Sequence, residues 1–130
     1  HQLMTDIREA KIQKVADFIP EQEIVGSKKG DLLVVSWGGT RGTTQAAVEE
    51  LQKEGKKVSL AHFHHIMPLP KNTHEVLAGF KKIVVCELNS GQFVNYLRMK
   101  EPDFKYTQYN KVMGLPFTVT ELVNKFNEML

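Results

Sequence analysis

The sequence predicts an α/β fold, because it contains two units in which a strand, a glycine-bearing turn and a helix follow one another. In the first unit, residues 31–42 read DLLVVSWGGTRG and residues 43–55 read TTQAAVEELQKEG. An uncharged run ending in glycines is typical of a strand buried on both faces, and the next segment is typical of a helix closed by Gly55. The second unit, residues 80–98, reads FKKIVVCELNSGQFVNYLR. Turns that follow parallel strands lie at one edge of the sheet, where ligands and partners bind.

The segment before the first unit is predicted to be an arm followed by a weak strand. Apolar residues recur in it at roughly helical spacing, namely Met4, Ile7, Val15 and Phe18. Pro20 ends that helix, and the charged residues 21–25 form a short strand candidate. We therefore expect a helical linker arm over residues 1–19, outside the core of a domain over residues 20–130. Its apolar face lacks a partner, so we expect the chain to self-associate through the arm.

The rest of the chain continues the alternation of strands and helices. Further strands are predicted over residues 57–63, 82–86 and 104–109, and further helices over residues 72–79, 91–99 and 118–130. Asn72 and Thr118 are each followed three residues later by a glutamate, Glu75 and Glu121. This spacing predicts a capping box at the start of both helices.

Composition excludes several classes of protein. The 130 residues fit one domain, and 17 basic against 15 acidic residues leave a net charge of +2. Such a balance does not favour nucleic acid or an anionic membrane as a partner. No apolar run is long enough to span a membrane and no signal peptide opens the sequence. The single cysteine excludes an internal disulfide and favours a reducing, cytoplasmic location, and the first residue, His1, suggests a piece of a longer polypeptide.

The glycine turn after the first strand has two interpretations. Backbone N–H groups of residues 38–42 at a helix start could cradle an anion, with Arg41 adding positive charge. The spacing is not that of the dinucleotide motif G-x-G-x-x-G, and the turn lacks the Lys-Ser/Thr pair of a P-loop. Alternatively, the glycines let the chain turn tightly and let the helix pack closely on the sheet.

Histidines gather after the strand at residues 57–63. His62 and His64 share a face if the strand continues through them, and His65 follows directly. A metal site would need a third converging ligand, and only His74, on another element, is available. Hydrogen-bonded histidines in a turn are therefore the favoured interpretation, and no metal site is predicted.

Three other side chains at the ends of strands are candidates for a chemical role. Cys86 ends a buried strand, where a free cysteine commonly acts as a small apolar residue. Glu87 could be a general acid or base if buried, but the favoured interpretation is an acceptor of hydrogen bonds from the turn at residues 89–91. Trp37 is predicted to anchor the core at the strand end. No catalytic set follows from these residues.

Three segments together resemble one enzyme family. The runs LLVVSWGGTRG, AVEELQKEGKKVSLAHFHHIMPLPKN and FKKIVVCELNSGQFVNYLR are similar to core domain II, the carboxyl-terminal domain, of the alpha subunit of 2-oxoacid:ferredoxin oxidoreductases, with the 2-oxoglutarate type nearest. That family has a W-G-S/T-x-x-G type turn, a P-L-P and an E-x-N-x-G-Q motif. The matching positions are residues 37–42, residues 68–70, and Glu87, Asn89, Gly91 and Gln92. Gly39 and Arg41 depart from the family pattern, as do the histidines before the P-L-P.

The resemblance implies a transketolase carboxyl-terminal-like fold. This is a three-layer α/β/α domain with a five-stranded, mostly parallel sheet whose first strand is antiparallel. It also implies a parent enzyme that uses thiamine diphosphate, Mg and iron–sulfur centres to convert 2-oxoglutarate and coenzyme A to succinyl-CoA and carbon dioxide, with ferredoxin as the electron acceptor.

In the family, those cofactors lie in other domains or in the beta subunit. This chain has no G-D-G…N thiamine signature and no cysteine cluster. No catalytic, cofactor-binding or metal-binding residue is therefore expected in it. The domain is expected to hold the subunits together, with the other alpha-subunit domains and the beta subunit as partners.

The two turns supply the residues predicted to form a crevice or an interface. They are Trp37, Gly38, Gly39, Thr40, Arg41 and Gly42 from the first turn, and Glu87, Asn89, Gly91 and Gln92 from the second. The alternative function is a small stand-alone domain that binds a ligand or an anion through the glycine turn at residues 38–42.

Overall fold

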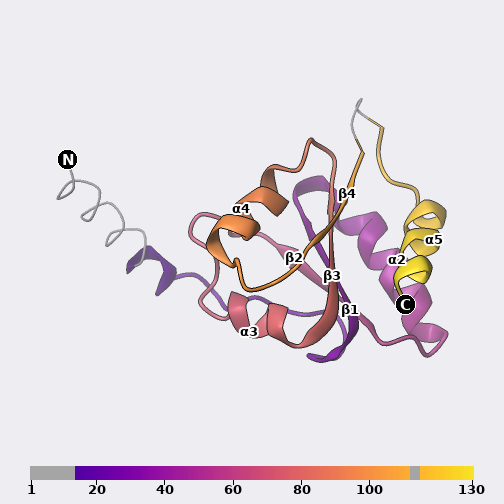
Figure 1. Cartoon of the computed structure of the whole chain (residues 1–130), viewed down its shortest axis with the longest axis horizontal. Coiled ribbons are helices and arrows are strands. Elements are labelled where there is room, and N and C mark those ends of the chain that lie inside the picture. The colour runs from indigo at the N-terminus through magenta and orange to yellow at the C-terminus, as the bar shows by residue number, and fades with distance from the viewer. Residues whose placement is uncertain (1–13, 112–114) are drawn as a thin grey trace.

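A four-stranded parallel sheet forms the centre of the molecule. The computed structural model describes residues 14–111 and 115–130. The strands are β1 (Gly30–Trp37), β2 (Val58–Phe63), β3 (Phe80–Glu87) and β4 (Thr107–Asn110), in the spatial order β2-β1-β3-β4 (Figure 1). Every pairing between neighbouring strands is parallel. The carboxyl ends of all four strands therefore meet along one edge of the sheet, which we call the carboxyl rim.

Helices cover both faces of the sheet. The short helix η1 (Gly38–Thr40) leads from β1 into α2 (Arg41–Lys53), which packs with α5 (Val119–Met129) on one face. Helices α3 (Thr73–Ala78) and α4 (Gln92–Lys100) pack on the other face (Figure 1). This confirms the predicted three-layer α/β/α architecture.

The central strands supply side chains to both layers of the core. In β1, Leu32 and Val34 pack towards α2 and α5, whereas Leu33 and Val35 pack towards α3 and α4, and all four are fully buried. Alternate residues of a strand point to opposite faces, so a strand covered on both sides must be apolar throughout. This is the physical origin of the continuous apolar run that predicted β1.

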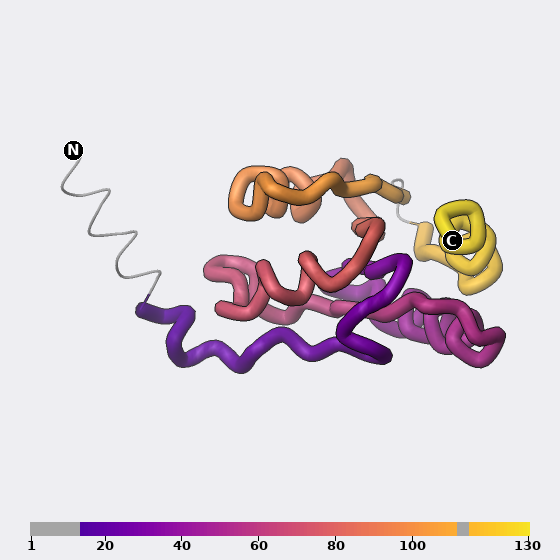
Figure 2. The backbone as a smooth tube through the Cα atoms, turned by 60° about the horizontal axis from the view of Figure 1, so that its bottom comes forward, coloured from indigo at the N-terminus to yellow at the C-terminus, as the bar shows by residue number. Residues whose placement is uncertain are grey.

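The prediction of a fifth, antiparallel strand over residues 21–25 is wrong. Only one antiparallel bridge forms in this segment, between Val25 and Leu60. Figure 2 shows the chain before β1 running beside the sheet and then turning into it. The backbone N–H of Gln22 donates to Oδ1 of Asn72 at 2.7 Å, and Nδ2 of Asn72 donates to the carbonyl of Gln22 at 3.0 Å. A side-chain amide thus occupies the backbone groups that a strand would use.

The same amide explains why the first predicted capping box is wrong. Asn72 precedes α3 but makes no side-chain cap, because its amide is bonded to Gln22. The second box is confirmed. Oγ1 of Thr118 accepts from the backbone N–H of Glu121 at 3.2 Å, and the Glu121 carboxylate accepts from the Thr118 N–H at 2.8 Å. The hydrogen bond from Lys111, at 2.6 Å, lowers the pKa of Glu121.

The predicted helical arm lies mostly in residues 1–13, outside the described part of the chain. Residues 14–16 are helical, and the helix ends before Pro20 as expected. Ala16 is buried and Asp17 forms an ion pair with Lys71, whereas Phe18 is 88% exposed. Across residues 14–111 and 115–130, no helix has the length and apolar character needed to cross a membrane.

Candidate functional site

The two turns singled out from the sequence meet at the carboxyl rim. They follow β1 and β3, which are neighbouring parallel strands. Nε1 of Trp37 donates to Oε1 of Glu87 at 3.0 Å. The ring of Trp37 also packs edge-on against Phe93, with ring centroids 6.0 Å apart. Trp37 is thus half-buried at the edge of the core, and it joins the ends of the two strands.

Glu87 serves the structure as a hydrogen-bond acceptor. Its side chain is fully buried, and its two oxygens accept from the backbone N–H groups of Phe93 at 2.7 Å and Val94 at 3.0 Å. These donors lie in the first turn of α4, where a helix leaves N–H groups without partners. The sequence predicted that the donors come from residues 89–91. In that turn Oδ1 of Asn89 is the acceptor, and it accepts from the backbone N–H groups of Gly91 at 2.8 Å and Gln92 at 3.1 Å.

Gly91 is required by the backbone and by its neighbours. Its φ is +99°, a left-handed conformation that side chains disfavour. A Cβ at this position would also press on the side chains of Gln108 and Asn110. The second turn is therefore shaped by internal packing, and Ser90 and Gln92 are exposed.

The glycines of the first turn are in a different position. A Cβ added at Gly38, Gly39 or Gly42 would meet no described residue within 4 Å, and among these three only Gly38 has a positive φ, of 66°. The expectation that they allow α2 to pack closely on the sheet is therefore wrong. Residues further along α2 make that contact, namely Thr44, Ala47, Val48 and Leu51. Gly39 and Gly42 expose bare backbone at the rim.

A hollow of about 400 Å³ lies beside the first turn, between the ends of β1 and β2. Its wall includes Trp37, Gly38 and Arg41 from one side and His62, Phe63 and His64 from the other. We call it the rim pocket. None of residues 87–92 lines it, so it adjoins the first predicted turn alone. The feature of the sequence that indicates the second wall is the cluster of histidines around the end of β2, because His62 and His64 both line the pocket.

Behind this pocket lies a buried polar network. Oγ of Ser36 is 2.7 Å from Nδ1 of His62, and both residues are buried. The hydroxyl of Thr44 lies 3.3 Å from Oγ of Ser36 and donates to the carbonyl of Thr40 at 2.7 Å. Burial, together with the electrostatic effects of the neighbouring His64 and Arg41, lowers the pKa of His62 from 6.5 to about 4. His62 is therefore neutral at pH 7.

Arg41 has an unusual set of partners for an arginine. Nη1 of Arg41 lies 3.1 Å from Nε2 of His64, and Nε donates to Oε1 of Gln45 at 3.3 Å. No carboxylate of the described residues lies within 4.0 Å of it. Most of the donors of the guanidinium therefore remain available.

The other candidate residues that can titrate are engaged in hydrogen bonds or buried in the core. The interpretation of hydrogen-bonded histidines is confirmed for His62 and His64, and His74 bonds to Glu101 at 2.6 Å, away from both. Cys86 is fully buried in the apolar core, as predicted, and burial raises its pKa well above the usual range. In the part of the chain that the structure describes, no three His, Cys, Asp or Glu residues are arranged to hold a metal ion.

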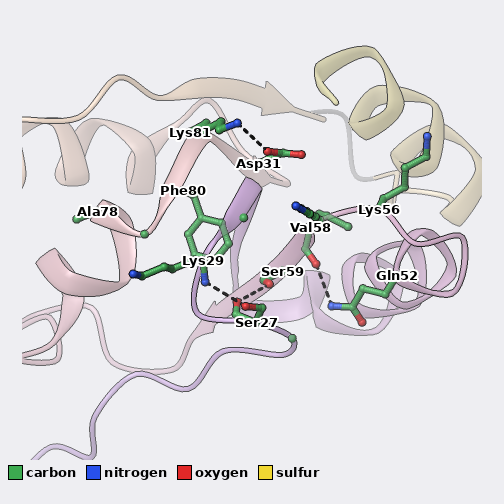
Figure 3. A pocket seen from close by; sticks show the side chains of 14 residues that line it. Ser27, Lys29, Asp31, Gln52, Lys56, Val58, Ser59, Ala78, Phe80 and Lys81 are labelled. Atoms are coloured by element: carbon green, nitrogen blue, oxygen red, sulfur yellow. Dashed lines mark hydrogen bonds and ion pairs between the residues drawn. The ribbon is translucent and has the colours of Figure 1, made fainter.

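A larger hollow, of about 770 Å³, lies at the opposite end of the sheet. Figure 3 shows Phe80 near its centre, with the side chains of Lys29 and Lys56 extending away from each other. Lys81 is paired with Asp31 at 3.3 Å. This hollow was not predicted from the sequence, although a pair of lysines stands at or near the start of β1, β2 and β3. Diverging lysines do not form a site that holds one ligand.

The chain matches the family model of pyruvate:ferredoxin oxidoreductase core domain II over residues 30–121. This match covers β1 through the start of α5, which is most of the described domain. The chain belongs to this family.

Relatives of this core domain II are subunits of 2-oxoacid oxidoreductases. The chain is 36% identical over 124 residues to the 2-oxoglutarate oxidoreductase subunit KorA of Mycobacterium tuberculosis, covering 94% of the chain and 18% of that protein. It is 26% identical over 134 residues to subunit alpha of 2-oxoacid:ferredoxin oxidoreductase 2 of Aeropyrum pernix, covering 99% of the chain and 21% of that protein. The chain thus spans about a fifth of these relatives' length.

Solved structures agree with the family and the fold. The 2-oxoglutarate:ferredoxin oxidoreductase of Magnetococcus marinus, solved with 2-oxoglutarate, coenzyme A and succinyl-CoA bound, matches with a TM-score of 0.89 at 32% identity, over 99% of this core domain II and 23% of that chain. A split-gene transketolase, an inactive beta4 tetramer, matches with a TM-score of 0.61 at 15% identity over 83% of the chain and 41% of its own. The second likeness confirms the transketolase-like fold class.

Proposed function

We propose that this chain is core domain II of the alpha subunit of a thiamine-diphosphate-dependent 2-oxoglutarate:ferredoxin oxidoreductase, acting in the cytoplasm. The domain holds the enzyme together. The conversion of 2-oxoglutarate and coenzyme A to succinyl-CoA and carbon dioxide takes place elsewhere in the complex, and the electrons pass to ferredoxin. The observation that carries this proposal is the family match over residues 30–121 together with the 0.89 TM-score to the Magnetococcus marinus enzyme.

The chemistry of the side chains supports a role outside catalysis. An iron–sulfur cluster is held by several cysteine thiolates, but the one cysteine of this chain is buried in the apolar core. A Mg ion that holds a diphosphate needs carboxylate or amide oxygens on an open site. Glu87, the buried carboxylate at the rim, already accepts three N–H donors. These residues do not fit the cofactors, and no reaction step is assigned to them.

Bare backbone at the rim supports an assembly role. Gly39 and Gly42 are exposed, and none of the residues that the structure describes fills the space where their side chains would be. A glycine lowers stability where the backbone conformation does not require one. It is favoured, however, where another chain approaches the backbone so closely that a side chain would clash. In the proposed enzyme, a neighbouring domain or the beta subunit packs on these two positions.

The test is co-purification of the full-length polypeptide that contains this chain with the beta subunit of a 2-oxoacid:ferredoxin oxidoreductase. We expect a stable complex that reduces ferredoxin only when 2-oxoglutarate and coenzyme A are both supplied. Gly39→Leu with Gly42→Leu should abolish the complex without lowering the melting temperature of the isolated chain. Glu50→Leu, an exposed substitution further along α2, is the matched control and should leave the complex intact. If the complex still forms with both leucines present, the proposed interface at Gly39 and Gly42 is wrong.

A separate measurement tests the absence of catalysis in this chain. Calorimetric titration of the 130-residue chain with thiamine diphosphate and Mg should show no saturable heat. Micromolar binding would contradict the proposal and favour the alternative of a stand-alone ligand-binding domain.

A further inference from the structure

We propose that the rim pocket binds the carboxylate of a small organic acid whose apolar part lies against Trp37 and Phe63. The carboxylate lies between the guanidinium of Arg41 and Nε2 of His62. This binding is independent of the assembly role, because it uses the wall between β1 and β2 and not the exposed backbone of Gly39 and Gly42.

Arg41 provides the charge. Among the described residues, its partners are Gln45, which engages one nitrogen, and the imidazole of His64, which engages another. A guanidinium fork matches the two oxygens of a carboxylate, and such charge-assisted pairs are among the strongest hydrogen bonds in proteins. The wall of the rim pocket includes no Asp or Glu side chain, so nothing on it opposes an anion.

Acidic residues face the neighbouring hollow. Glu21 and Glu23 line an adjoining cavity of about 240 Å³ that shares Arg41, His62 and His64 with the rim pocket. Neither carboxylate lies within 4.0 Å of a cation among the described residues. They would repel an anion from their own cavity, and this places the bound carboxylate on the Trp37 side.

His62 provides a second donor, and the buried network orients it. The hydroxyl of Thr44 donates to the carbonyl of Thr40, and Oγ of Ser36 lies 2.7 Å from Nδ1 of His62. In the proposed complex, the hydroxyl of Ser36 donates to Nδ1 of His62. A neutral imidazole that accepts at Nδ1 carries its proton on Nε2. His62 is only 8% exposed, and within residues 14–111 and 115–130 no group bonds to Nε2. With its proton on Nε2 at the wall of the rim pocket, His62 can donate to an acceptor of a ligand.

The apolar walls select the kind of acid. Trp37 and Phe63 are neighbours in the register of β1 and β2, and the partly buried Ile66 completes that side. A phosphate group, strongly hydrated on all sides, makes no use of such a surface. A monocarboxylate with an aromatic or aliphatic body uses both the polar and the apolar parts of the pocket.

The chain carries its own reporter for this site. Trp37 is the only tryptophan in the sequence, so the intrinsic fluorescence of the 130-residue chain reports on the rim pocket. Phenylacetate is the probe, and we expect a saturable change in emission. Phenylacetamide, which has the same ring but no charge, and inorganic phosphate should each bind at least about tenfold more weakly.

Variants separate the pocket from non-specific binding. Arg41→Gln should weaken phenylacetate about tenfold, because a charge-assisted pair is lost, and the chain should stay folded because Arg41 is exposed. Arg98→Gln on α4 removes an equal charge away from the pocket and should leave the affinity unchanged. Equal binding of phenylacetamide, or an equal effect of the two arginine variants, would overturn the proposal.

The carboxylate that enters the rim pocket could also belong to a side chain of another protein. N-acetyl-glutamate amide represents that source, and the proposal predicts that it binds more weakly than phenylacetate because it lacks the apolar body. Tighter binding of the glutamate probe would overturn the small-acid assignment and place the carboxylate on a partner protein. As an independent readout, bound phenylacetate should raise the NMR-measured pKa of His62, and an unchanged value would place the ligand elsewhere.

Discussion

Nε1 of Trp37 donates to Oε1 of Glu87 at 3.0 Å, and this bond joins the carboxyl end of β1 to that of β3. The carboxylate it reaches is fully buried, and three N–H groups surround it where a cation is usually found. One side chain therefore holds the first turn of α4, the end of β3 and the half-buried indole together. The rim keeps its shape because of this contact.

Glu87→Gln should destabilise the domain by about 2–4 kcal/mol, because the amide turns an N–H group towards donors that now lack an acceptor. Trp37→Phe, which removes one donor and keeps an aromatic ring, should cost only about 1 kcal/mol. Urea unfolding followed by circular dichroism measures both. Glu50→Gln, on the exposed side of α2, is the control and should stay within about 0.5 kcal/mol of the parent. An equal effect of Glu87→Gln and Glu50→Gln would show that the buried carboxylate is dispensable.

The glycines of the two turns should respond in opposite ways to alanine. Gly91→Ala forces a side chain into a positive φ and against Gln108, so we expect a loss of about 1–3 kcal/mol. Gly39→Ala has open space and no positive φ, so we expect no loss, or a gain of about 0.4–1 kcal/mol through the unfolded state. Thermal unfolding of the two variants at equal concentration is the measurement. A comparable loss at Gly39 would mean that the first turn is as closely packed as the second.

His62 should make stability depend on pH. Its pKa is about 4 in the folded chain and near 6.5 when unfolded, so the unfolded state takes up the proton first as the pH falls. The stabilisation by neutral His62 is complete above about pH 6.5 and is lost progressively down to about pH 4, by up to about 3 kcal/mol. The loss between pH 7 and pH 4.5 should be smaller in His62→Asn, whose Oδ1 can still accept from Ser36. Parallel losses in the two proteins, measured by urea unfolding, would contradict the lowered pKa.

Removal of the arm tests the domain boundary. Deletion of residues 1–19 should give a monomer by analytical ultracentrifugation, and its melting temperature should fall little beyond the loss of any dimer linkage. Within the described residues, the deletion removes few contacts. They are the packing of the buried Ala16 and the exposed ion pair between Asp17 and Lys71. Unfolding of the shortened chain would show that the arm belongs to the core.

Asn72→Ala provides the matching test on the domain side. It releases both backbone groups of Gln22 and should cost more than the deletion, about 1–3 kcal/mol, because part-buried groups lose their partners. Thermal unfolding of the two variants at the same concentration compares them directly. A smaller loss for Asn72→Ala than for the deletion would show that the domain begins before residue 20.

Local sequence was sufficient to predict the α/β class and the strands and helices from β1 to α5. The apolar run from Leu32 to Val35 and the alternation of strands with amphipathic helices are consequences of burial on both faces of one sheet, so they predicted the α/β class directly. The Thr118 and Glu121 pair predicted its cap because both partners lie within one helical turn. Interactions between residues that are close in sequence can be predicted without knowledge of the fold.

Only the tertiary structure decided which distant groups meet. Asn72 bonds to Gln22, fifty residues away, and not to its own helix, because folding brings the two segments side by side. The strand order places β2 beside β1, so the pocket forms between Trp37 and His62 and not between the two predicted turns. Burial behind that pocket also sets the pKa of His62. The free energy of such contacts depends on spatial neighbours and solvent access, and no local pattern of residues records either one.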